Sequence, residues 1–111
     1  MAVAEISIEP LGTNTPSVGD LVTASVQALK KEPHLKFDVT AMGTVVEGDT
    51  QRIFEAARRM QEACFQAGAQ RVILSIRLDE RHDKPTSMEQ MEREVEQRIG
   101  ASGNQPSTRL T

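Results

Sequence analysis

This 111-residue sequence has few aromatic side chains and no large excess of charge of either sign. It contains no tryptophan, no tyrosine and three phenylalanines, and its formal net charge is −3 without a long run of like charges. Nucleic-acid-binding proteins rely on clustered Lys and Arg and, for single strands, on aromatic side chains that stack on bases. The composition therefore argues against a nucleic-acid partner.

Cysteine and long apolar segments are also scarce. The one cysteine, Cys64, cannot form an internal disulfide, as is usual in a reducing compartment. No apolar run approaches the roughly 18 residues of a membrane-spanning helix, and residues 1–15 lack the basic and apolar regions of a secretion signal. We expect a cytoplasmic protein with no membrane partner.

The sequence also lacks Cys and His residues at the spacings typical of metal sites. His34 and His82 lie far apart, Cys64 falls on the apolar stripe of an expected helix, and no Cys-x-x-Cys or His-x-x-x-His pair occurs. We therefore predict no metal site and no cofactor.

The sequence gives little evidence for a set of catalytic residues. The charged segment 79–84 offers acid and base groups, but such a segment is more often a solvated turn, and no nucleophile has an evident base. An enzyme acting on a phosphorylated small molecule is a third reading, disfavoured because the loop at residues 10–16 contains no arginine. We predict that the protein is not an enzyme and has no catalytic residues.

Hydropathy patterning predicts the order β-α-β-β-α-β. Apolar and polar residues alternate, as in half-buried strands, in residues 3–9, 36–42, 44–47 and 71–78. Helical spacing of apolar residues follows in residues 17–32 and 50–67, where Phe54 is expected to widen the second apolar stripe. Short connections and right-handed crossovers favour an α+β ferredoxin-like sandwich, with two helices on one face of a four-stranded antiparallel sheet.

A further helix is predicted at about residues 86–99. Thr86 and Glu89 have the spacing of a capping box. The narrow apolar stripe of this helix must be buried against its own sheet or a neighbouring subunit; it consists of Met88, Met91, Val95 and Ile99. We assign residues 1–99 to one domain and expect residues 100–111 to be a disordered tail.

The sheet face opposite the helices is expected to be mixed in character. It should carry Glu5, Ser7, Thr40, Met42, Thr44, Ile73 and Ser75. In a monomer this face would meet water, so it hints at self-association. Its hydroxyl groups can also line a small-molecule pocket, closed by Met42 and Leu11, although Ser and Thr equally suit strands and helix caps.

Several segments resemble the thiamine-binding protein family. They are Ala-Glu-Ile-Ser-Ile-Glu-Pro-Leu-Gly-Thr at residues 4–13, Ser17-Val-Gly-Asp, Thr40-Ala-Met-Gly-Thr-Val-Val-Glu-Gly48, Arg71-Val-Ile and Leu78-Asp-Glu-Arg-His-Asp-Lys-Pro. The resemblance covers roughly residues 3–99. Its most specific part is Met42-Gly43-Thr44 with Glu47-Gly48, and Ala41 stands where members commonly carry proline.

The resemblance implies homodimers or homotetramers of ferredoxin-like domains, built through sheets and the C-terminal helix. It also implies non-enzymatic binding of thiamine (vitamin B1) or its hydroxymethylpyrimidine moiety, to hold or deliver it. The candidate ligand-binding residues are Glu5, Ser7, Leu11, Thr15, Thr40, Met42, Gly43, Thr44 and Glu47. Met42 offers a soft surface for the ring, and the acidic residues can offset the thiazolium charge. The alternative is an interaction module whose open sheet face serves only homo-oligomer assembly.

Overall fold

The computed structural model describes residues 1–12, 18–83 and 87–101. Its elements are β1 (Ala2–Leu11), α1 (Val18–Lys30), β2 (Lys36–Val39), β3 (Thr44–Gly48), α2 (Thr50–Gln66), β4 (Arg71–Glu80) and α3 (Met88–Ala101). The order is the predicted one. The predicted tail begins two residues inside α3, and its remainder, residues 102–111, lies outside the described residues.

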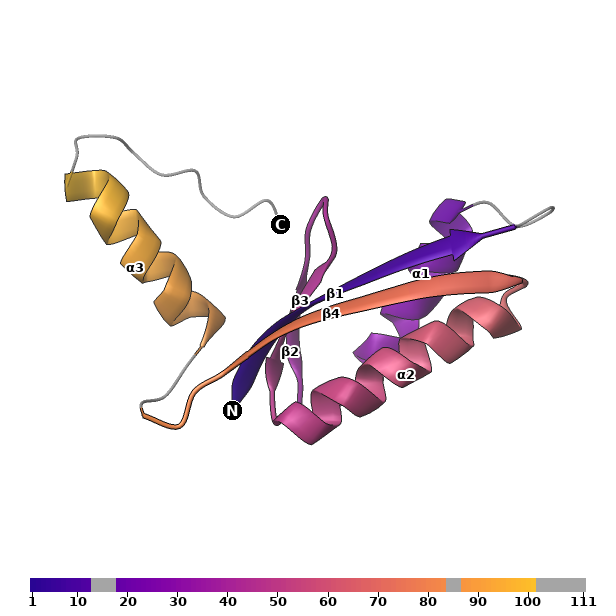
Figure 1. The fold of residues 1–111 in the computed structure, drawn as a ribbon, viewed down its shortest axis with the longest axis horizontal. Helices are drawn as coiled ribbons and strands as arrows, with labels where there is room; N and C mark the ends of the chain where they lie inside the picture. Colours follow the sequence, from indigo (N-terminus) through magenta and orange to yellow (C-terminus); the bar gives the residue numbers. More distant parts are fainter. Residues whose placement is uncertain (13–17, 84–86, 102–111) are drawn as a thin grey trace.

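The sheet has the strand order β2-β3-β1-β4, and every neighbouring pair is antiparallel. Helices α1 and α2 lie side by side against one face (Figure 1). This arrangement confirms the predicted ferredoxin-like α+β sandwich. Strand β4 pairs along the whole of β1, whereas β3 pairs with β1 only between Ala2 and Ile6.

The core lies between the sheet and the two helices. Ala4 and Ile6 of β1 point toward α2, where Ile53 and Met60 are fully buried. Burying an aliphatic side chain of this kind stabilises a fold by about 1.5–3 kcal/mol. Phe54 does not widen the stripe as predicted. It is 51% exposed, because it lies about 100° around the helix axis from Ile53.

The C-terminus of α2 ends in a Schellman motif. The Gly68 N–H donates to the Phe65 carbonyl at 3.1 Å, and the Ala69 N–H donates to the Cys64 carbonyl at 3.0 Å. Gly68 has φ 119°, a conformation that costs little only for glycine. Gly68 directly follows Ala67, the last residue of the helix predicted at residues 50–67.

Helix α3 lies on the other side of the sheet from α1 and α2 (Figure 1). Ser87 Oγ accepts the Gln90 N–H at 3.1 Å and so caps this helix; the predicted cap, Thr86, lies outside the described residues. Met88 is buried and α3 contacts β3, whereas Val95 is 52% exposed. Among the described helices, none is long and apolar enough to cross a membrane.

Candidate functional site

A hollow, here called the notch, forms where β3 ends beside β1. The last pair between these strands is Ile6 with Thr44, and β1 then continues to Leu11 with only β4 as a described neighbour. The notch has a volume of about 180 Å³. It is lined by Ile6, Ser7 and Ile8 of β1, Val22 and Ser25 of α1, residues 39–44 of the β2–β3 hairpin, and Met60 of α2.

The turn between β2 and β3 forms one wall of the notch. The Thr40 N–H and hydroxyl both donate to the Gly43 carbonyl at 2.8 Å, and the Met42 N–H donates to Thr40 Oγ1 at 3.3 Å. The Thr40 hydroxyl therefore serves the turn itself. Met42 stands at the tip with 80% of its surface exposed, so its thioether is free to meet a ligand.

The turn lies close to β1 because residue 43 is glycine. A Cβ atom there would lie 2.9 Å from the Ile6 carbonyl oxygen and 3.3 Å from Glu5 Cγ. Both distances are shorter than ordinary van der Waals contact, so a side chain would push the turn away from β1 and change the shape of the notch.

Ser25 is the polar group on the floor of the notch. It is 1% exposed, and its hydroxyl donates to the Val22 carbonyl within α1 at 2.6 Å. Met60 and Val22 beside it are apolar. Ser25 falls within the helix predicted at residues 17–32 and was not among the predicted ligand-binding residues. A serine in an otherwise apolar stripe was the available signal.

The structure brings together part of the predicted ligand-binding set. Ser7, Thr40, Met42, Gly43 and Thr44 line the notch. Thr44 does so from the helix-covered side rather than from the open face, because its partner Ile6 points toward the helices and directly paired residues share a face.

The other predicted ligand residues do not line the notch. Glu47 pairs with Val3 and is buried, and Leu11 is the last residue of β1, paired with Arg71. Thr15 lies outside the described residues. Glu5 is exposed, and its Cγ atom lies next to Gly43 on the open face.

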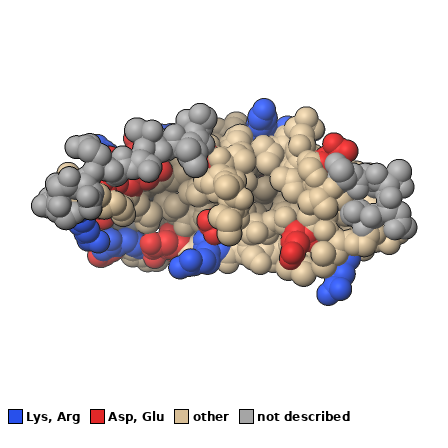
Figure 2. Space-filling view, turned by 90° about the horizontal axis from the view of Figure 1, so that it is seen from above, with Lys and Arg blue, Asp and Glu red and all other residues tan. Residues whose placement is uncertain are grey.

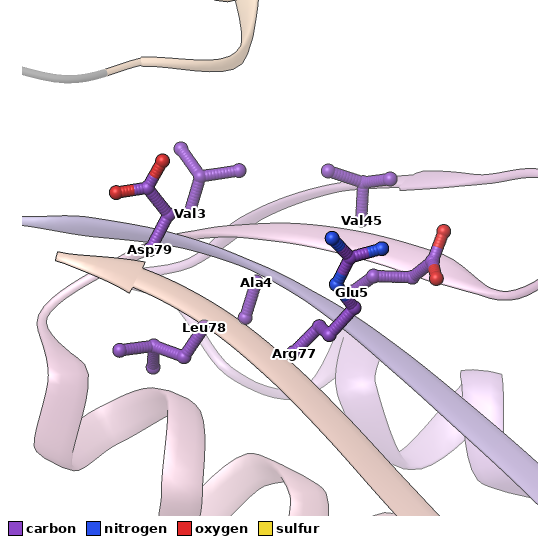
Figure 3. Close-up of a pocket in the computed structure, with 7 residues that line it drawn as sticks. All are labelled: Val3, Ala4, Glu5, Val45, Arg77, Leu78 and Asp79. Carbon is purple, nitrogen blue, oxygen red and sulfur yellow. The ribbon is translucent and has the colours of Figure 1, made fainter.

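A second, shallower hollow of about 310 Å³ lies on the open face of the sheet. Figure 3 shows Val3, Glu5, Val45, Arg77 and Asp79 on this side of the strands, with Ala4 and Leu78 on the other. Arg77 stands directly opposite Glu5 in the β1–β4 register. With Asp79 also in the lining, the hollow carries charged groups of both signs.

Charge on the molecular surface is dispersed. In the view of Figure 2, basic and acidic side chains are interspersed among large uncharged areas, without a patch of either sign. Among the described residues, no group of three or more His, Cys, Asp or Glu is placed to hold a metal ion. Cys64 is fully buried, and this burial raises the pKa of its thiol.

Comparison with known proteins places the chain in a family. The family model described as thiamine-binding protein matches residues 4–96. The chain belongs to the thiamine-binding protein family. The match includes β1, the hairpin and both helices that line the notch.

Relatives of the chain share most of their length with it. The UPF0045 protein YqgV from Bacillus subtilis is 41% identical over 93 residues, which is 80% of this chain and 88% of that protein. The UPF0045 protein MJ1052 from Methanocaldococcus jannaschii is 39% identical over 87 residues, 78% of this chain and 84% of that protein.

Solved structures similar to the chain have the same fold. The crystal structure of MJ1052 superimposes with a TM-score of 0.76 and 36% identity, covering 85% of this chain and 94% of that one. A Bacillus cereus domain of unknown function, DUF77, gives a TM-score of 0.75 at 26% identity, covering 80% of this chain and 84% of that one.

Proposed function

We propose that this member of the family binds thiamine or its hydroxymethylpyrimidine moiety in the notch, without transforming it. The observation that carries the proposal is the family match over residues 4–96, which spans every element that lines the notch. In this role the protein holds or delivers the vitamin or its precursor.

The size of the notch favours the pyrimidine half of the ligand. Pockets for drug-sized molecules enclose about 300–1,000 Å³. The 180 Å³ of the notch suits a single substituted ring, with the thiazolium ring of thiamine lying outside. Glu5 stands beside Gly43 at the rim, where its carboxylate can face a positive charge. An exposed pair of this kind contributes little, so the ring contacts must supply most of the affinity.

The chemistry of the lining supports binding without catalysis. The described residues that line the notch contribute aliphatic side chains, thioethers, hydroxyls and backbone groups, and the Glu5 carboxylate at the rim stands outside this lining. Proton transfer needs a group whose pKa lies near the working pH, which hydroxyl side chains do not provide.

Native mass spectrometry with and without thiamine and hydroxymethylpyrimidine tests the proposal. We expect one ligand mass per subunit or per pair of subunits. We also expect a rise in melting temperature at saturating ligand, because a ligand that binds only the folded state stabilises it. A protein that gains no mass and melts at an unchanged temperature with both compounds at millimolar concentration rules the proposal out.

Exposed apolar residues favour self-association as a second candidate function. Ile73 on the open face is 40% exposed and Val95 on α3 is 52% exposed. We propose that the protein forms homodimers or homotetramers through these surfaces and works in the cytoplasm, where its free Cys64 stays reduced. If no ligand binds, assembly alone becomes the leading function.

A further inference from the structure

The backbone of β1 presents to the notch a hydrogen-bonding edge that no described strand uses. The Ile6 carbonyl oxygen lies 2.9 Å from the position of a Gly43 Cβ, so it points toward β3. In an antiparallel sheet, successive residues direct their N–H and C=O groups to opposite neighbours. The N–H and C=O of Ile8 therefore point to the same side as those of Ile6, into the notch, where no described strand pairs with β1.

Pro10 is consistent with this assignment. It lies on β1 with the same parity as Ile6 and Ile8, opposite Val72. Proline lacks an N–H, and in strands it is tolerated where that group would face an unpaired edge. The ladder to β4 therefore loses no donor at this residue.

Ser25 adds an acceptor on the floor. Its single hydroxyl hydrogen is donated to the Val22 carbonyl at 2.6 Å, which leaves oxygen lone pairs as its only free capacity. Ser25 is 1% exposed, so water cannot easily satisfy its oxygen, and the site favours a ligand group that donates a hydrogen bond. A ligand acceptor placed against Ser25 Oγ would leave both oxygen atoms without a hydrogen bond.

We propose that the notch recognises a planar heterocycle carrying a ring nitrogen next to an exocyclic amine, read by the Ile8 backbone and Ser25. The ring nitrogen accepts the Ile8 N–H, the amine donates one hydrogen to the Ile8 carbonyl, and its second hydrogen goes to Ser25 Oγ. The ring edge thus takes the place of a β3 residue beside β1. This inference rests on the proposed function and names the part of the ligand that gives specificity.

The corresponding oxo compound reverses this pattern. Its exocyclic oxygen accepts a hydrogen bond and its neighbouring ring nitrogen donates one. In the same orientation, the ring N–H would meet the Ile8 N–H, and the exocyclic oxygen would meet two acceptors, the Ile8 carbonyl and Ser25 Oγ. Turning the ring over restores the two backbone bonds but carries the ring substituent to the opposite side of the notch. The amino form is therefore selected.

Isothermal titration with thiamine and its 4-oxo analogue tests the selection in the wild type, Ser25→Ala and Thr23→Ala. We expect the wild type to prefer thiamine by at least about tenfold. Ser25→Ala should weaken thiamine binding about fivefold and leave the 4-oxo analogue unchanged or tighter, which shrinks the preference. Thr23→Ala is the matched control, because Thr23 donates within the same helix to the Gly19 carbonyl at 2.9 Å but is exposed and outside the notch.

Amide hydrogen exchange provides a readout that needs no variant. The Ile8 amide should exchange rapidly in the free protein and become protected when hydroxymethylpyrimidine is added, whereas the Ser7 amide, bonded to β4, should be protected throughout. Equal affinity for the amino and oxo compounds, an unchanged preference in a folded Ser25→Ala protein, or an unprotected Ile8 amide at saturation overturns the inference and leaves the proposed function standing. A wild type that binds neither compound overturns both.

Discussion

At the scale of single residues, Gly43 and Cys64 show how contacts between distant segments shape the molecule. Gly43 is not in the left-handed region, so the reason for glycine there is space rather than backbone conformation. Cys64 bridges the two helices, because its thiol contacts the Leu21 carbonyl oxygen at 3.3 Å across the α1–α2 contact. Each residue can be tested separately.

Gly43→Ala should lower the free energy of unfolding by about 1–3 kcal/mol, as overpacking does in a tight contact. The added Cβ would meet the Ile6 carbonyl oxygen, and backbone atoms cannot move aside as a flexible side chain can. Urea denaturation measures the change. Ala41→Gly in the same turn is the control. It should lower the free energy of unfolding by no more than about 1 kcal/mol, because glycine raises the conformational entropy of the unfolded chain. Equal stability of Gly43→Ala and the wild type would show that the turn has room to move.

The Cys64 thiol should be inert to alkylating reagents in the folded protein at neutral pH. Its burial raises its pKa above the ordinary 9.0, and the thiolate is the reactive form. Because the folded pKa lies above the unfolded one, the contribution of this group to stability is present below about pH 9 and is lost as pH rises through the folded pKa. Labelling rates with and without denaturant check this, and rapid labelling of the native protein would contradict it.

At the scale of elements, α3 differs from the other two helices. Helices α1 and α2 are anchored by several fully buried side chains, whereas α3 is anchored near its start by Met88. Its stripe continues through Val95, which is half exposed. A helix with one buried turn and a half-exposed valine farther along its apolar stripe gains stability when a second subunit covers that valine.

Val95→Glu should therefore reduce the particle mass measured by sedimentation. A buried carboxylate at a subunit contact would lack a partner, which weakens association. Gln97→Glu adds the same charge at an exposed position of α3 and should leave the mass unchanged. If Val95→Glu sediments like the wild type, the stripe lies outside any subunit interface.

At the scale of the whole molecule, the two surfaces of the sheet differ in what covers them. The helix-covered face holds the core, and the notch opens at its margin, between β1 and the hairpin turn. The opposite face carries the mixed hollow and is partly covered by α3. The proposed ligand binding and the proposed self-association therefore fall on separate parts of the molecule, and one substitution can distinguish them.

Met42→Glu should weaken the binding of hydroxymethylpyrimidine, which has no thiazolium charge, at least about tenfold while the oligomer persists in native mass spectrometry. The side chain stands at the rim of the notch with 80% of its surface exposed, so replacing it leaves the core intact. A carboxylate removes the soft apolar surface on which a ring can lie. Dissociation of the oligomer with unchanged ligand affinity would instead place Met42 in a subunit contact.

Much of the fold could be predicted because its signals are local. Alternation in residues 71–78 reflects the two-residue period of a strand, and Gly68 follows from the conformation that ends a helix. The direction of side chains at the ends of helices and strands was harder to predict from the sequence. Thr44 was expected on the open face. In the structure β3 begins at Thr44, which pairs with Ile6 and therefore faces the helices.

The sequence by itself determined the order of the elements, the helix-covered face of the sheet and the resemblance to a family, since periodicity and motifs depend on neighbours in the chain. Only the tertiary structure decided where β3 stops beside β1, that Ile8 presents its backbone there, and that Ser25 lies beneath it. These features depend on strand register and on the approach of the hairpin turn to β1. Both are set by contacts between segments far apart in the sequence, which no local pattern encodes.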